Sequence, residues 1–376
     1  MVTSLRIAIL GTRGIPGNYG GFETFAEEFG ARLVERGHRV TVYCRTGNAP
    51  RSLRSHRGMH LVHLPAVRHK YAETITHTAL SALHAALRRF DVVYVCNSAN
   101  APICYIPWLR RQRPVLNVDG LEWRRRKWGR VARRYYRWAA GLAARMPIEV
   151  VTDAEVIQRY YRDTLHRETR CFAYGTALYD RGHLAERVRQ LGLVPDRYLL
   201  YVSRMERENN PLLVVEGYRS VETDLPLVMV GDAPYAQNYM DEVRAAADRR
   251  VVFLGFKFGD DYHALQANAR VYIQATEVGG THPALVEAMG HRNAIVAHDV
   301  PEHHEVLGDA GRYFARGDRE DLAAQLGSLL GNDAAISDLR QRAGRRVADR
   351  YSWEAVTNAY EEYLVGLVHG TPSAHA

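Results

Sequence analysis

The 376-residue sequence is poor in lysine and cysteine and has no long hydrophobic run. No stretch approaches the ~18 consecutive apolar residues of a membrane-spanning helix, and the N-terminal segment lacks the cleavage site of a secretory signal. With 47% hydrophobic and 24% charged residues, the composition is typical of a globular protein, which we expect to be soluble and cytoplasmic. We expect neither a disulfide scaffold nor a structural zinc site, because no C-x-x-C pair occurs among the four cysteines, Cys44, Cys96, Cys104 and Cys171.

The positive charge is almost entirely arginine and is unevenly distributed. Only three lysines (Lys70, Lys127 and Lys257) occur among the 50 basic side chains. Residues 1–180 carry 29 basic and 14 acidic side chains, whereas residues 181–376 carry 21 and 28. Genome composition is an alternative explanation for the excess of arginine, but it does not explain the difference between the halves. This asymmetry predicts that the first half meets an anionic partner.

Short apolar runs alternate with helical patterns in both halves of the chain. In the first half they predict strands at Arg6–Leu10, Val40–Cys44, His60–Leu64, Val92–Cys96, Val115–Val118 and Glu149–Thr152. In the second half they predict strands at Tyr198–Val202, Leu227–Val230, Val251–Leu254, Val271–Gln274 and Ala294–Ala297. Strands that alternate with helices form parallel sheets covered on both faces. The fold class that we expect is therefore α/β, with two doubly wound, Rossmann-like domains.

We expect an N-terminal domain over residues 1–180 and a C-terminal domain over residues 181–350. A final helix is predicted at residues 351–369, followed by a frayed tail at 370–376. Open parallel sheets bind ligands beyond the carboxyl ends of their strands. We therefore expect the binding and catalytic residues in the loops that directly follow the strands.

A glycine-rich loop, Gly11–Gly21, follows the first expected strand and opens a helix. Its glycines allow close approach of the backbone to a ligand, and a helix start favours an anion. The spacing differs from G-x-G-x-x-G, and Arg45 rather than an acidic residue closes the second strand, so a dinucleotide site is not expected. A tight strand-to-helix turn is the structural alternative.

Asp119 follows another expected strand and precedes a glycine. A carboxylate there could orient or deprotonate a hydroxyl, and an Asx turn or helix cap is the alternative interpretation. The next residues, Arg124, Arg125 and Arg126, open a segment up to Trp138 in which arginines alternate with aromatics. Such a segment suits phosphate groups or anionic lipid headgroups. A solvated helix face and a nucleic-acid contact are the alternatives.

Two motifs in the second half follow strands and suit an anion. Arg204 could bind a phosphate with two hydrogen bonds, although an ion pair with Glu206 or Glu208 would explain it equally well. In the second motif, Gly279-Gly-Thr-His-Pro283, the glycines give close approach, Thr281 or His282 can cap, and Pro283 suits the first helical position. Free amide groups at this helix start would face an anion such as a diphosphate. Glu287, one turn further on, is placed to accept hydrogen bonds from sugar hydroxyls.

These motifs resemble the GT-B glycosyltransferases of family 4. The similar features are the Gly20-Gly21 pair, the Gly279–Met289 segment, and Tyr351–Val356, which resembles the start of the family's last helix, the one that crosses back to the first domain. Gly11–Pro16 with Tyr19–Thr24, and Asn117–Trp123, resemble more narrowly the bacterial rhamnosyltransferase branch with its characteristic N-terminal domain. The resemblance covers about residues 5–366.

The resemblance implies two domains facing a cleft and a hexosyltransferase that builds cell-surface polysaccharide. The implied donor is a nucleotide-sugar, dTDP-L-rhamnose in this branch, and the sugar would be transferred with retention and without a metal or other cofactor. No Asp-x-Asp pair is present to hold a metal. The implied catalytic residues are Asp119, Arg204 and Glu287. The donor site would comprise Asn209, Gly231, Glu277, Gly279, Gly280 and Thr281, and the acceptor side Gly20, Gly21, Glu23, Arg124, Arg125 and Arg126.

The sequence departs from the family pattern at two positions. Gly279 stands eight residues before Glu287, where the family usually has a glutamate, and the nearest acid is Glu277. Asn209 replaces the usual lysine five residues after Arg204. Losing this cation leaves Arg204 and the helix amides to carry more of the diphosphate charge.

We expect a lipid-linked saccharide as the acceptor and a peripheral position on the anionic inner face of the cell membrane, with no nucleic-acid partner. Two alternatives come from other classes of protein. A nucleotide-sugar 2-epimerase with the GT-B fold would also bind a nucleotide, but it needs acid and base carboxylates and no acceptor. A non-enzymatic polyanion-binding protein would explain the basic half but not the motif from Gly279 to Glu287.

Overall fold

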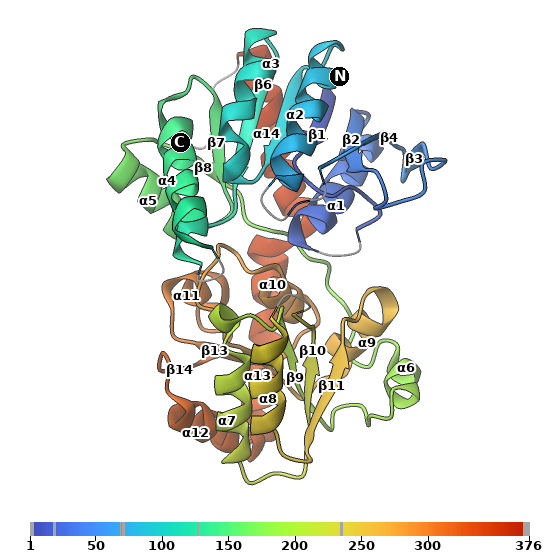
Figure 1. The fold of residues 1–376 in the computed structure, drawn as a ribbon. Coiled ribbons are helices and arrows are strands. Elements are labelled where there is room, and N and C mark those ends of the chain that lie inside the picture. The colour runs from blue at the N-terminus through green and yellow to red at the C-terminus, as the bar shows by residue number, and fades with distance from the viewer. Residues whose placement is uncertain are drawn as a thin grey trace. The chain divides into compact units, whose positions relative to one another are not determined.

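The computed structural model describes residues 4–17, 20–67, 69, 72–125, 128–233 and 236–370. They form two compact units, each built on one sheet (Figure 1). Unit 1 comprises Met1–Arg124, Trp128–Tyr174 and Trp353–Ala376, and unit 2 comprises Arg125–Lys127 and Gly175–Ser352.

Unit 1 contains an eight-stranded sheet in the order β3-β4-β2-β1-β5-β6-β7-β8, parallel except for the β3–β4 hairpin. Its strands are β1 (Arg6–Leu10), β2 (Arg39–Arg45), β3 (Ser55–His56), β4 (Met59–Leu64), β5 (Val92–Cys96), β6 (Arg113–Val118), β7 (Glu149–Thr152) and β8 (Arg170–Cys171). Its helices are α1 (Gly21–Glu35), α2 (Glu73–Ala86), η1 (Ser98–Cys104), α3 (Tyr105–Leu109), η2 (Glu122–Arg124), α4 (Arg130–Arg145), α5 (Glu155–Leu165) and α14 (Trp353–His369).

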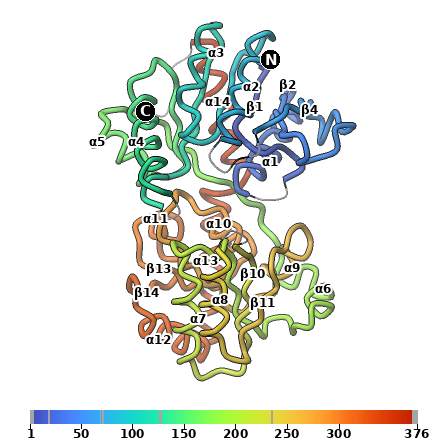
Figure 2. Tube along the Cα trace, viewed as in Figure 1, coloured from blue at the N-terminus to red at the C-terminus, as the bar shows by residue number. Residues whose placement is uncertain are grey.

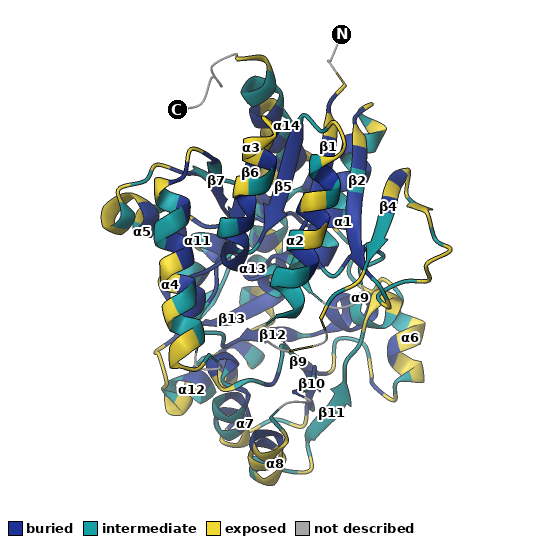
Figure 3. Ribbon diagram, turned by 45° about the horizontal axis from the view of Figure 1, so that its top comes forward, coloured by how far each residue is buried: buried dark blue, intermediate teal, exposed yellow. Residues whose placement is uncertain are grey.

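Helices cover both faces of the unit 1 sheet because successive strand residues point to opposite sides. Ala8 and Val93 face one way and belong to the apolar cluster formed with α2, α4 and α5. Tyr94 faces the other way, where its ring lies 5.6 Å from that of Phe25 on α1 and 5.9 Å from that of Tyr360 on α14. The central strands are correspondingly buried (Figure 3).

A buried polar contact fixes the last helix to unit 1. The Asn117 side-chain amide donates to the Tyr94 hydroxyl oxygen at 2.7 Å, and the Tyr94 and Tyr360 hydroxyls lie 2.9 Å apart. Buried polar groups are stabilising when they find such partners. In Figure 2 the red tube of α14 runs among the blue and green segments of unit 1.

Unit 2 contains a six-stranded parallel sheet in the order β11-β10-β9-β12-β13-β14. Its strands are β9 (Leu199–Val202), β10 (Leu227–Val230), β11 (Val251–Gly255), β12 (Val271–Gln274), β13 (Ala294–His298) and β14 (Arg312–Phe314). Its helices are α6 (Ala185–Gln190), η3 (Arg207–Asn209), α7 (Pro211–Arg219), α8 (Gln237–Ala246), α9 (Gly259–Asn268), α10 (Pro283–Gly290), α11 (Pro301–Leu307), α12 (Arg319–Leu330), α13 (Asp333–Arg346) and η4 (Val347–Tyr351).

The α/β fold class and all eleven expected strands are confirmed, with ends that differ by one or two residues. The expectation lacked β3, β8 and β14, which are two or three residues long and too short to show periodicity. Pro283 is the first residue of α10, as expected. Each central strand is apolar on both faces, which is why short runs were sufficient to find it.

Candidate functional site

The expected donor residues of unit 2 lie at the carboxyl edge of its sheet. Arg204 follows β9, Gly231 follows β10, and Gly279 follows β12. Because β9 lies between β10 and β12, the strand order reverses there, and ligands bind at such a switch point in open parallel sheets. The fold thus brings together three loops that are far apart in the sequence.

Gly231 packs the β10 loop against the backbone that precedes Arg204. Its φ is 125°, and a Cβ atom at this position would lie 1.7 Å from the carbonyl oxygen of Ser203. The Gly231 amide donates to the Gly255 carbonyl at 2.8 Å, which ties in the loop after β11. No residue with a side chain fits this close contact.

Arg204 is half-buried, and its guanidinium makes no ion pair or hydrogen bond with any residue in the described ranges. The alternative expectation, an ion pair with Glu206 or Glu208, is therefore wrong. Asn209 is buried and donates its amide to the Arg204 carbonyl at 2.5 Å. Asn209 thus shapes the loop that presents Arg204, and the cation remains available for an anion.

Glu277 is held within the protein. Its carboxylate accepts a hydrogen bond from Asn210 at 3.0 Å and lies 3.2 Å from the Arg316 guanidinium. Its backbone amide donates to the Glu208 carbonyl at 2.9 Å. These contacts fix the loop after β12 to the loop after β9, so the observed role of Glu277 is to anchor the site.

The start of α10 is buried, and no side chain caps it. Gly279, Gly280 and Thr281 are buried, and His282 occupies the N-cap position with φ of 31°. The His282 side chain makes no capping hydrogen bond, which corrects the expectation that it could cap. Pro283 has no N–H, and the Leu285 and Val286 amides donate to the His282 carbonyl at 2.8 and 3.3 Å. Of the first helical amide groups, that of Ala284 is left for a negative charge.

Two histidines behind this loop hold each other in defined tautomers. His303 Nδ1 donates to the His298 carbonyl at 2.8 Å, and its Nε2 lies 3.0 Å from His282 Nδ1. Burial lowers the pKa of His282 to about 4 and that of His303 well below its usual value, so both rings are neutral at pH 7. His282 Nδ1 therefore donates to His303 Nε2, and the other nitrogen of the His282 ring is Nε2. A Cβ atom on Gly279 would lie 2.3 Å from that Nε2, so the imidazole occupies the space where a larger residue 279 would start.

Glu287 is oriented by a line of polar side chains that the sequence did not reveal. The Tyr262 hydroxyl donates to the Glu287 carboxylate, and Gln266 donates to the Tyr262 oxygen at 3.1 Å. Asn293 in turn donates to the side-chain amide oxygen of Gln266, Oε1, at 3.1 Å. Tyr262 and Gln266 lie on α9, whose four-residue spacing places them on one side of the helix. Nothing in the sequence links α9 to α10, so only the tertiary structure identifies these partners.

In unit 1, Glu23 and Asp119 lie near the carboxyl end of β5. Glu23, one turn into α1 after Gly20 and Gly21, is buried and accepts the Arg13 amide at 2.7 Å. Burial raises the pKa of Glu23. Burial also raises the pKa of Cys96 at the end of β5, with smaller contributions from the charges of Glu23 and Asp119. Both carboxylates thus lie near the switch point of this sheet, where β1 lies between β2 and β5.

Only some side chains of the arginine and aromatic segment around Trp123–Trp138 lie on the protein surface. The Arg124 guanidinium lies over the Tyr160 ring, 5.9 Å from its centroid, Arg125 is half-buried, and Arg126 lies outside the described residues. Trp123 and Tyr136 are buried, so these two aromatic side chains of the segment are not on the surface. Helical spacing turns Tyr136 into the core with three alanines of α4, and Trp138 is exposed beside arginines.

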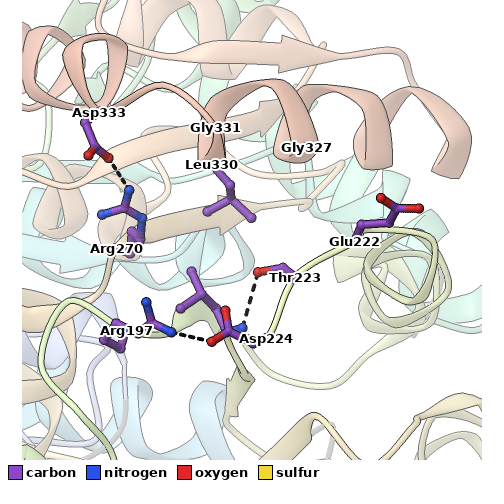
Figure 4. Close-up of a pocket in the computed structure, with 10 residues that line it drawn as sticks. Arg197, Glu222, Thr223, Asp224, Arg270, Gly327, Leu330, Gly331 and Asp333 are labelled. Atoms are coloured by element: carbon purple, nitrogen blue, oxygen red, sulfur yellow. Dashed lines mark hydrogen bonds and ion pairs between the residues drawn. The ribbon is translucent and has the colours of Figure 1, made fainter.

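A separate pocket of unit 2 lies at the amino edge of the sheet (Figure 4). Arg197 precedes β9 and pairs with Asp224, while Arg270 precedes β12 and pairs with Asp333. The arginines of this pocket are therefore already neutralised by carboxylates, unlike Arg204.

In the part of the chain that the structure describes, no group of three or more His, Cys, Asp or Glu side chains is arranged to hold a metal ion.

Comparison with known proteins indicates the class. Residues 196–332 match the family model for glycosyl transferases group 1, and residues 5–177 match a domain of unknown function, DUF1972. The two parallel sheets and the solved structures below support the GT-B fold, and the first of these matches relates residues 196–332 to the glycosyl transferases of group 1.

Individual relatives are distant. The O-antigen chain mannosyltransferase B of Escherichia coli is 26% identical over 174 residues, which are 44% of this chain and 45% of that protein. The match thus spans less than half of the relative's length. Among solved structures, a sucrose-phosphate synthase from Thermosynechococcus elongatus has a TM-score of 0.81 at 17% identity, covering 97% of this chain and 99% of that one. HepE of Anabaena, in complex with UDP and glucose, has a TM-score of 0.77 at 18% identity, with 96% and 99% covered.

Replacing Gly231 by alanine is expected to destabilise unit 2 by about 3 kcal/mol, because the added Cβ collides with Ser203 at a positive φ. The control is Gly327→Ala in α12, where a Cβ meets nothing within 4 Å and should stabilise by about 0.5–1 kcal/mol. Urea unfolding measures both. Equal stability of the two variants would contradict the close contact at Gly231.

Buried neutral histidines are expected to make the protein acid-sensitive. The pKa of His77 and of His282 is lowered by burial to about 4, below the unfolded value of about 6.5. As the pH falls through this interval the unfolded chain takes up protons that the folded chain does not, so the free energy of unfolding decreases. Urea unfolding at pH 7.5 and pH 5 measures the loss.

His77→Phe is expected to flatten this pH dependence by no more than about 3 kcal/mol, which is the free energy linked to a pKa lowered from about 6.5 to about 4. The control, His304→Gln, alters an exposed ring paired with Asp299 and should leave the slope unchanged. A pH dependence that is the same in His77→Phe and wild type would rule out this origin.

Proposed function

We propose that the protein transfers L-rhamnose from dTDP-rhamnose to a lipid-linked saccharide during cell-surface polysaccharide synthesis, with retention and without a metal. The observation that carries the proposal is the carboxyl edge of unit 2. There, Arg204 has no carboxylate partner among the described residues, and the uncapped start of α10 follows a buried Gly279-Gly280 pair. A cation and a helix start at one edge suit a diphosphate.

The proposed roles of the site residues depend on where negative charge develops during the transfer. As the bond between the sugar and the diphosphate breaks, negative charge grows on the departing phosphate oxygens. Arg204 and the amide groups after Gly280 would stabilise that charge, which is usually the largest single contribution to such catalysis. Glu287, oriented by Tyr262, would accept hydrogen bonds from donor hydroxyls.

Residues of the first half of the sequence would bind the acceptor. Asp119 would orient the acceptor hydroxyl or assist its deprotonation at the carboxyl edge of the first sheet. Arg124, Arg125 and Arg126 would hold the pyrophosphate of a lipid-linked acceptor. The similarity to an O-antigen mannosyltransferase, and to WaaG, a glycosyltransferase of lipopolysaccharide biosynthesis with a TM-score of 0.72 at 15% identity covering 97% of this chain and 100% of that one, supports a cell-surface product.

Neither alternative from the sequence is favoured by these comparisons. An epimerase would turn over the donor without an acceptor. A polyanion binder would bind with a steep dependence on salt and without hydrolysing any nucleotide-sugar. Both outcomes can be read in the donor assay below.

Wild-type protein is expected to be stabilised selectively by dTDP-rhamnose over UDP- and GDP-sugars in the presence of EDTA. A ligand at ~100 times its dissociation constant stabilises by about 2.7 kcal/mol, which a thermal-shift assay detects. Arg204→Gln should weaken donor binding about tenfold or more because it removes a charge-assisted hydrogen bond. Gly280→Val should abolish donor binding by blocking the helix start.

The matched control for Arg204→Gln is Arg345→Gln, an exposed arginine of α13. A preference for UDP- or GDP-sugars would discard rhamnose and keep the sugar transfer. No shift with any nucleotide-sugar would overturn the proposed function.

Replacing Arg124, Arg125 and Arg126 together by serine is expected to raise the KM for a lipid-linked acceptor and leave donor binding intact, because the change removes three cations near Asp119 in the sequence. Transfer to a radiolabelled lipid-linked acceptor measures it. The control replaces Arg219, Arg249 and Arg345, exposed arginines of unit 2, by serine. Unchanged transfer in the first variant would contradict this role.

A further inference from the structure

Exposed apolar side chains gather on one side of unit 1, around the end of α2 and on α3. Twelve large hydrophobic side chains are exposed in the described chain, and half of them lie between residues 80 and 109. Leu87 is 84% exposed and Leu109 is 71% exposed, so these are surface groups and not frayed core. Figure 3 shows exposed segments on both helices. We call this surface the α2–α3 face; its apolar members are Leu80, Leu83, Leu87, Tyr105, Trp108 and Leu109.

The fold holds the two parts of this face together. Leu80, Leu83 and Leu87 recur at intervals of three and four residues and therefore share one side of α2 and its end. Gln112, just after α3, donates its side-chain amide to the carbonyls of Ala85 at 3.0 Å and Arg88 at 2.8 Å. These hydrogen bonds fix the end of α3 to the end of α2, so the six apolar side chains form one surface.

The rim of the face is strongly basic. Arg88, Arg89, Arg110 and Arg111 are exposed, and none of them forms an ion pair with a carboxylate in the described ranges. Arg110 donates its Nε to the carbonyl of Ala86. Between residues 74 and 118 the sequence contains one acidic residue, Asp91, whose carboxylate accepts the Arg6 amide at 2.7 Å.

We propose that the α2–α3 face docks unit 1 onto a bilayer that contains anionic lipids. Leucines and a tryptophan–tyrosine pair, with ring centroids 6.1 Å apart, supply the side chains that enter the headgroup region. Unneutralised arginines around them complement negative headgroups. No helix in the described part of the chain is long and apolar enough to span a membrane. The proposal deepens the membrane part of the proposed function and rests on it, but it assigns contact with the bilayer to a surface other than the Arg124–Arg126 segment.

The test is co-sedimentation of the full chain with vesicles of phosphatidylcholine alone or of phosphatidylcholine with phosphatidylglycerol. Wild type should bind the anionic vesicles and lose binding as salt rises. Leu83, Leu87 and Leu109 replaced together by Gln should weaken binding about tenfold or more, as should Arg88, Arg89 and Arg111 replaced by Gln. These side chains are exposed, and a thermal melt equal to that of wild type shows that each variant is folded.

The matched control removes three exposed arginines of unit 2, Arg219, Arg249 and Arg345, by replacement with Gln and should bind like wild type. Equal loss in the control, or loss only when Arg134, Arg137 and Trp138 on α4 are replaced, would overturn the proposal. A dimer in light scattering that the leucine variant abolishes would do the same, since the face would then meet a second copy. Donor binding is followed by thermal shift in the same samples. Donor binding without vesicle binding rejects only the docking face, whereas vesicle binding through this face without donor binding rejects only the sugar transfer.

Discussion

The carboxyl edge of the second sheet depends on one backbone contact, the approach of Gly231 to the carbonyl of Ser203. A Cβ atom there would lie 1.7 Å from the carbonyl oxygen, so the loops after β9 and β10 can meet only through a glycine. That contact precedes Arg204, whose carbonyl is held by Asn209, and Glu277 ties the same loop to the start of α10. The backbone position of Arg204 is thus set by contacts that do not use its guanidinium, so they do not compete with a ligand for its charge.

The departures from the family pattern make physical sense together. Asn209 cannot supply a positive charge, but as a neutral donor it closes the loop that presents Arg204. Gly279 cannot supply a carboxylate, but its lack of a side chain leaves space for the His282 imidazole. Since burial keeps that ring neutral, the site has lost one negative and one positive group relative to the usual pattern. A diphosphate bound as proposed would therefore meet a charge balance that is shifted less than either change alone would suggest.

The sequence was sufficient for the strands and for the loops that follow them, because buried parallel strands are continuous apolar runs and ligands bind where those runs end. It could not reveal Tyr262 or His303, which act through contacts between helices that no local pattern encodes. The alternation of arginine with aromatic residues after Trp123 also could not show which aromatic side chains face solvent. The helical period of α4 turns Tyr136 inward and leaves Trp138 outside.

Within unit 1, the proposed docking surface and the proposed acceptor site lie at opposite edges of the sheet, because of the direction in which α2 runs. Connecting helices in a doubly wound domain run back from the carboxyl edge of the sheet to its amino edge. Leu87 precedes β5 and Leu109 precedes β6, so both lie toward the amino edge, whereas Asp119 follows β6 and lies at the carboxyl edge. A bilayer that held the α2–α3 face would therefore leave the carboxyl edge open to water and to the sugar end of an acceptor. The arginines of the first half would then have two separate roles. Those at the rim of the α2–α3 face would attach the protein to the bilayer, and those after Trp123 would bind the phosphate groups of the acceptor.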